Sequence, residues 1–138
     1  MPGRRLLEQL LDADGGAPMR MDGDDLVHTD YSVGNVLFDE SGRVTAVVDW
    51  NTGVARGDRR YALIGLKWRS VDRSTMPAAQ LSLIEETMID LDPSMRRSYE
   101  AHWWVHRAHM SIVKGFRTEQ IMRDLAAAAD ALGSATSR

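Results

Sequence analysis

A change in the spacing of apolar residues near residue 58 constrains the fold of this chain most strongly. Before it, apolar residues come in short runs over 26–28, 35–39 and 43–49, and the last run is rich in β-branched residues, which favour strands. After it, apolar residues recur every three to four positions, which is typical of amphipathic helices. The pattern therefore predicts an α+β fold, in which a few short strands precede a mainly helical part.

The elements can be bounded by their turn and cap residues. Glu40-Ser41-Gly42 separates the second and third runs, and its composition predicts a β-hairpin. Helices are predicted over 4–14, from 61 into the low 70s, over 77–90, over 93–114 and over 118–132. We expect one domain over residues 1–138, with a hairpin part at 26–50 and a helical subdomain at 58–132.

Composition narrows the classes of function. The net charge is −3 and no basic run is present, so the sequence does not indicate a nucleic-acid-binding protein. The absence of cysteine excludes disulfides, thiolate metal sites and cysteine catalysis. No stretch approaches the roughly 20 apolar residues of a membrane span. We expect a soluble, cytoplasmic protein that does not bind membranes.

Polar residues follow the ends of the strand-like runs at a fixed spacing. His28-Thr29-Asp30 ends the first run, Asn35 follows five residues after Asp30, and Asp49 ends the third run. Phosphoryl transfer to a hydroxyl needs a carboxylate to orient that hydroxyl, and oxygen ligands to hold Mg²⁺ on the nucleotide. Because a hairpin would bring Asn35 and Asp49 near each other, the pattern favours a site for this chemistry.

The same residues carry a family resemblance. H-x-D-x-x-x-x-N, followed by an aspartate after an apolar strand, resembles the catalytic and metal loops of kinases. The segment VHTDYSVGNVLFDESGRVTAVVDWNTGVARGD is similar to the aminoglycoside phosphotransferase family, which includes choline-kinase-like and homoserine-kinase-like enzymes. The resemblance implies a protein-kinase-like C-lobe, and transfer of phosphate from ATP to the hydroxyl of a small molecule.

The resemblance also implies a role for each matching residue. Asp30 would be the catalytic base, and His28 would brace its loop. Asn35 and Asp49 would bind Mg²⁺ and, through it, ATP. Asp58, in Gly57-Asp58-Arg59 where the family has G-D-P, would be structural.

The chain departs from the family pattern in several places. Only 25 residues precede Leu26, the first lysine is Lys67, and no glycine-rich loop comes before the motif. Thr29 stands where the family has a small residue, and Ala62 where it has a carboxylate. We therefore expect a truncated C-lobe without the nucleotide-covering N-lobe. Uncovered apolar surface then predicts a homodimer or a partner that supplies that lobe.

These departures leave two functions open. The chain is either an ATP- and Mg²⁺-dependent phosphotransferase or a catalytically inactive or split C-lobe that acts as a binding module.

Three histidines in the helix predicted over 93–114 also have two interpretations. His102, His106 and His109 share one helix face, which could hold zinc. Their apolar neighbours on that face favour packed histidines instead.

Overall fold

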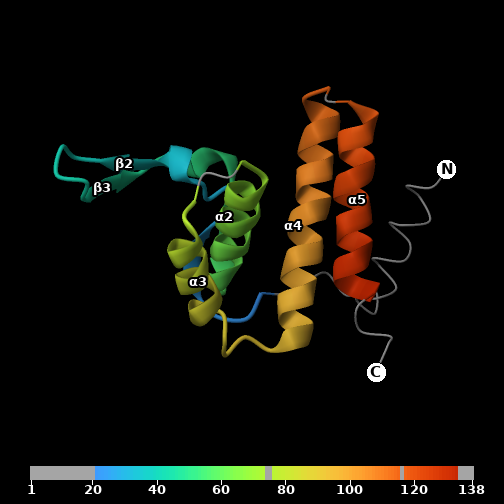
Figure 1. Cartoon of the computed structure of the whole chain (residues 1–138), viewed down its shortest axis with the longest axis horizontal. Coiled ribbons are helices and arrows are strands. Elements are labelled where there is room, and N and C mark those ends of the chain that lie inside the picture. The colour runs from blue at the N-terminus through green and yellow to red at the C-terminus, as the bar shows by residue number, and fades with distance from the viewer. Residues whose placement is uncertain (1–20, 74–75, 116, 134–138) are drawn as a thin grey trace. The chain divides into compact units, whose positions relative to one another are not determined.

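The computed structural model describes residues 21–73, 76–115 and 117–133 (Figure 1). Its elements are β1 (Asp25–His28), β2 (Val36–Phe38), β3 (Val44–Val47), β4 (Val54–Gly57), α2 (Arg60–Arg73), α3 (Ala78–Thr87), α4 (Pro93–Val113) and α5 (Thr118–Gly133), with 3₁₀ turns at Val33–Asn35 and Trp50–Thr52. The helix predicted over 4–14 lies outside the described residues. The described chain forms two compact units, which meet in sequence between Asp90 and Leu91. That the whole chain is one domain stays a prediction.

The strands form two separate antiparallel pairs. β2 pairs with β3, with Val36 opposite Val47, so the predicted hairpin is confirmed. β1 pairs with β4, with Asp25 opposite Gly57 and His28 opposite Val54. The sequence did not predict β4, because Val54-Ala55-Arg56-Gly57 contains one β-branched residue and ends in glycine.

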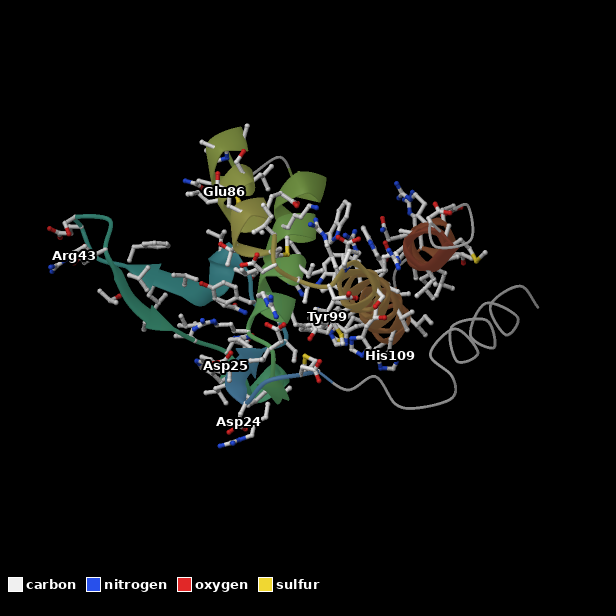
Figure 2. The ribbon with its side chains drawn as sticks, turned by 90° about the horizontal axis from the view of Figure 1, so that it is seen from below. Asp24, Asp25, Arg43, Glu86, Tyr99 and His109 are labelled. Atoms are coloured by element: carbon white, nitrogen blue, oxygen red, sulfur yellow. The ribbon has the colours of Figure 1, made fainter. Side chains whose placement is uncertain are left out.

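The β2–β3 turn is closed by the side chain of Asp39. Its Oδ1 accepts hydrogen bonds from the backbone N–H groups of Ser41 (2.9 Å) and Arg43 (3.0 Å), and Gly42 adopts a positive φ of 82°. The Ser41 hydroxyl and the Arg43 backbone, by hydrogen bonding to this carboxylate, lower the pKa of Asp39. Figure 2 shows Arg43 at the tip of the hairpin, away from the helices.

α2 supports the strands of the first unit. Tyr61 and Ile64 on this helix are buried, and α2 contacts both β1 and α3. Asp58 precedes α2 and is itself buried. Its Oδ1 accepts a hydrogen bond from the Arg60 backbone N–H (2.9 Å), and its Oδ2 lies 2.6 Å from the Arg60 guanidinium. These contacts fix the start of α2 next to the end of β4.

α4 and α5 form the second unit and lie side by side (Figure 1). Asp92 caps α4, since its carboxylate accepts hydrogen bonds from the backbone N–H groups of Ser94 (2.8 Å) and Met95 (3.2 Å). Gly115, with a φ of 68°, follows the end of α4. Both helices end within one residue of their predicted bounds, whereas α3 ends three residues before its predicted end.

Candidate active site

His28 joins the end of β1 to the end of β3. Its side chain is only 3% exposed, and its Nε2 donates a hydrogen bond to the Val48 carbonyl oxygen (2.9 Å). Its Nδ1 accepts a hydrogen bond from the Asp30 backbone N–H (3.2 Å). The two bonds together select the neutral imidazole with its proton on Nε2. The ring therefore fixes the backbone of the loop that carries Asp30, which is the geometry expected of a bracing residue.

Asn35 closes the same loop from its other end. Its Nδ2 donates a hydrogen bond to the Asp30 carbonyl oxygen (3.0 Å), and its own carbonyl oxygen accepts one from the Val48 backbone N–H (2.9 Å). Because the side-chain bond uses the amide nitrogen, the amide oxygen Oδ1 is the atom that Asn35 can offer to a cation. We call residues 28–35 the catalytic loop from here on.

Asp49 follows β3 directly and has an unusual backbone conformation. Its φ of 65° and ψ of 37° lie in the left-handed region, and no other non-glycine residue in the described segments has a positive φ. Such a conformation costs on the order of 1–2 kcal/mol, although aspartate tolerates it better than most residues. Residues held in this way cluster at functional sites.

Val48 is the point where the site residues meet. Its carbonyl oxygen binds His28, its N–H binds the backbone of Asn35, and Asp49 is the next residue along the chain. The structure thus brings His28, Asn35 and Asp49 to one edge of the two strand pairs. Asp30 lies in the loop between them.

The side chain of Asp30 pairs with an arginine that sequence reasoning missed. Arg69 comes from α2, 39 residues further along the chain, and its Nη2 donates to Asp30 Oδ1. The two side chains are 31% and 28% exposed, so the pair lies at the rim of the site. No local spacing rule links residues so far apart, and so the sequence carried no signal for this contact.

Thr29 and Gly53 fit together beside the catalytic loop. The Thr29 backbone N–H donates to the Gly53 carbonyl oxygen (3.0 Å). A Cβ atom at position 53 would lie 1.9 Å from Thr29 Oγ1, so any other residue there would require the Thr29 side chain or the backbone to move. The threonine side chain fills the space that Gly53 leaves.

The donor atoms suit magnesium better than zinc. No group of three or more His, Asp or Glu side chains in the described segments could hold a metal, which includes the three histidines of α4. Mg²⁺ usually takes one or two protein carboxylates and completes its shell with phosphate oxygens and water. The Asp49 carboxylate and Asn35 Oδ1 are hard oxygen donors of this kind, so the two residues fit a nucleotide-bound Mg²⁺.

A cavity of about 340 Å³ lies elsewhere in the first unit. It is lined by Asp22, Gly23, Asp25, Asp58, Arg59, Arg60, Thr87 and Asp90. Four of its six charged lining residues form two pairs, with Asp25 and Arg59 3.9 Å apart and Asp58 and Arg60 2.6 Å apart. Because Asp25 begins β1 and His28 ends it, the cavity lies at the opposite end of this strand from the catalytic loop.

The chain is similar to a known protein family and to solved structures. The family model described as "Phosphotransferase enzyme family" matches residues 5–81, more than half of the chain. The fold resembles a thermostable mutant of aminoglycoside phosphotransferase APH(4)-Ia in its apo form (TM-score 0.70, 24% identity). It also resembles ternary complexes of this enzyme with hygromycin B and either AMP-PNP (TM-score 0.67, 24% identity) or ADP (TM-score 0.67, 23% identity).

The coverage of these matches is unequal. The three structures align with 98% of this chain, but the chain spans only 44–45% of their length.

The predicted kinase-like α+β fold and the predicted family are both confirmed. No curated protein sequence matches the chain. Within the described residues, no helix has the length and apolar content of a membrane span.

Proposed function

Because the chain belongs to the phosphotransferase enzyme family, we propose that it transfers the γ-phosphate of ATP to a hydroxyl group of a small molecule. The observation that carries the proposal is the shape of the catalytic loop. His28 and Asn35 hold the backbone on either side of Asp30, and Asp49 follows the neighbouring strand. The residues that this chemistry requires therefore lie on one rigid frame.

In this proposal Asp30 acts on the acceptor. Its carboxylate accepts a hydrogen bond from the acceptor hydroxyl and takes the proton as the hydroxyl oxygen bonds to the γ-phosphorus. The bond between that phosphorus and the β–γ bridging oxygen breaks, and ADP leaves with its electron pair. His28 takes no proton in this step, because both ring nitrogens already hold the loop.

Asn35 and Asp49 supply the oxygen ligands for Mg²⁺. Such an ion would neutralise negative charge on the phosphates of the nucleotide. The Asn35 amide is oriented for this by its bond to the Asp30 carbonyl, and the Asp49 carboxylate by the left-handed backbone that carries it. In this proposal, ATP is therefore bound through the metal. We also propose that the reaction takes place in the cytoplasm.

The acceptor is proposed as a small hydroxylated compound. The similar structures are of an aminoglycoside phosphotransferase, and two of them contain hygromycin B, a hydroxylated aminoglycoside. Aminoglycosides are therefore the first acceptors to test, followed by other hydroxylated amines and sugars.

A second candidate function follows from exposed apolar side chains of the β2–β3 hairpin. Leu37, Phe38 and Val44 are 47%, 54% and 59% exposed, although all three are large apolar residues on paired strands. Apolar surface of this kind favours a covering partner. In this candidate the chain is a binding module or a split enzyme, and the cover is a second copy or a separate polypeptide with a nucleotide-binding lobe.

One assay separates the candidates. The purified chain is incubated with ATP and a panel of aminoglycosides, other hydroxylated amines and sugars, with Mg²⁺ or with a chelator. The phosphotransferase proposal expects ATP consumption that needs Mg²⁺ and an acceptor, and that is lost in Asp30→Ala. Consumption that survives Asp30→Ala contradicts the assignment of the base. Nucleotide binding without turnover, combined with dimers in light scattering, supports the second candidate.

A further inference from the structure

The ion pair between Arg69 and Asp30 is a poor candidate for a stabilising contact. Both side chains are about one third exposed, and ion pairs of such exposure contribute little to folding free energy. Yet Arg69 reaches from α2 to the one carboxylate in the catalytic loop. A contact that adds little stability and ends on a reacting group is better explained by what it does to that group.

The backbone of Asp30 is held on both sides, but its side chain is not held by those bonds. His28 accepts from its N–H, and Asn35 donates to its carbonyl oxygen. Neither bond restricts rotation of the carboxylate about its side-chain torsions. Among the described residues, Arg69 is the one that binds the Asp30 carboxylate, by donating to Oδ1.

Arg69 projects from a helix, α2, that is itself anchored. The helix is anchored by the buried side chains of Tyr61 and Ile64 and by the bonds of Asp58 at its start. From this anchored helix, Arg69 reaches the loop that carries Asp30.

The geometry points to Arg69 as a positioning residue for the reaction. We propose that its guanidinium binds Oδ1 of Asp30 and thereby turns Oδ2 toward the acceptor hydroxyl. The planar guanidinium offers donors in a fixed direction, which an ammonium group does not. This inference rests on the proposed phosphotransfer, and it adds a residue from the helical part of the chain to that site.

The kinetic test compares Arg69→Ala and Arg69→Lys with a control, Arg56→Ala. Arg56 also pairs with an aspartate, Asp24, at 2.5 Å, but both side chains are at least 75% exposed and lie at the other end of β1. Misplacing a reacting group can cost on the order of 10²-fold in rate, so kcat should fall by about 10- to 100-fold in Arg69→Ala. The KM values for ATP and acceptor should change by less than about threefold, because Arg69 acts on orientation.

The lysine variant distinguishes orientation from folding. Arg69→Lys keeps a charge in place and should recover at least about threefold of the lost kcat. Arg56→Ala should match the wild type. A normal kcat in Arg69→Ala, a lysine variant no better than alanine, or a loss confined to KM would each overturn the proposal. If Arg69→Ala melts at a markedly lower temperature, Arg69→Gln replaces it, with the same expected results.

A spectroscopic readout tests the contact without any turnover. In nitrogen-15 NMR of the full chain, the Arg69 guanidinium signals should be sharp and protected from solvent exchange, and should lose this protection in Asp30→Ala. Arg56 signals should be the same in both proteins. Unchanged Arg69 signals in Asp30→Ala would overturn the inference. If the wild type shows protected Arg69 signals but consumes no ATP, the proposed function fails while the carboxylate contact stands.

Discussion

The catalytic loop and the α4–α5 pair use polar side chains in opposite ways. In the loop, His28 and Asn35 bind backbone atoms, and the carboxylates of Asp30 and Asp49 remain at the surface. In the helical pair, Asp124 is only 1% exposed, and its Oδ1 lies 3.4 Å from the Nε of Arg107. Aspartate thus stabilises a helix pair in one region, and in the catalytic loop it is kept accessible.

The difference lies in what the neighbouring groups hold. Arg107 lies over the rings of Trp103 and Trp104, and Gln120 donates to Asp124 Oδ1 at 2.8 Å. In the loop the neighbours hold the backbone, and among the residues that the structure describes only one carboxylate oxygen of Asp30 is paired. We infer that removal of a loop carboxylate affects activity, whereas removal of a charge between the helices affects stability.

The largest effect is expected at Asp30. Asp30→Asn removes the proton acceptor and keeps the shape of the side chain, so turnover should fall by about 10²- to 10⁴-fold. The melting temperature should stay close to that of the wild type, because Asp30 is partly exposed. Measurements of ATP consumption and of thermal unfolding on the same preparation check the predicted turnover and the predicted melting temperature. An Asp30→Asn protein that retains activity, or that melts at a much lower temperature, would contradict the distinction between the two regions.

The next effect is expected in the helical pair. Arg107→Ala removes a cationic partner of the buried Asp124, which should cost about 3 kcal/mol of unfolding free energy. Urea denaturation followed by circular dichroism measures this cost. The matched control is Arg123→Ala on the exposed side of α5, where the change should stay within about 0.5 kcal/mol. Equal costs for the two variants would argue against a structural role for the Arg107 pair.

A third prediction concerns the support of the catalytic loop. In Gly53→Ala the new methyl group would overlap Thr29 Oγ1, so the Thr29 side chain, the loop or β4 must shift, at a cost of about 1–3 kcal/mol. Addition of Thr29→Ala to the same chain should recover part of the loss. Gly34→Ala is the control in the same loop, since its Cβ would lie 3.8 Å from the nearest atom, Ser32 Oγ. A Gly53→Ala protein as stable as the Gly34→Ala protein would contradict the close approach.

These predictions also mark what the sequence could reveal. The hairpin and the helices of 60–73, 93–113 and 118–133 were predicted well, because turn residues and helical spacing act over a few positions. β4 and the Arg69 contact were missed, since each depends on a partner about 30 or more residues away. The left-handed backbone of Asp49 also lay outside what spacing can indicate. The family motif predicted the site residues, and their roles stay predictions.

The smallest effect is expected at the cap of α4. The Ser94 hydroxyl and the backbone N–H groups of Met95 and Ser94, by hydrogen bonding to the carboxylate, lower the pKa of Asp92. A lowered pKa means that the carboxylate stabilises the fold above the unfolded value of 3.8, and that this stabilisation is lost as the pH falls below it. Asp92→Ala should therefore melt below the wild type at pH 6, and the difference should shrink as the pH falls below 3.8. A constant difference between the two proteins would exclude this linkage.

Calorimetry of nucleotide binding tests the central claim most directly. The account holds that Asn35 and Asp49 bind ATP through Mg²⁺ on the frame that His28 fixes. ATP should therefore bind the wild type only with Mg²⁺, and Asp49→Ala should weaken this binding by more than about tenfold. Asp24→Ala, which changes an exposed carboxylate at the far end of β1, should bind as the wild type does. An affinity for ATP that changes neither on removal of Mg²⁺ nor in Asp49→Ala would contradict the account.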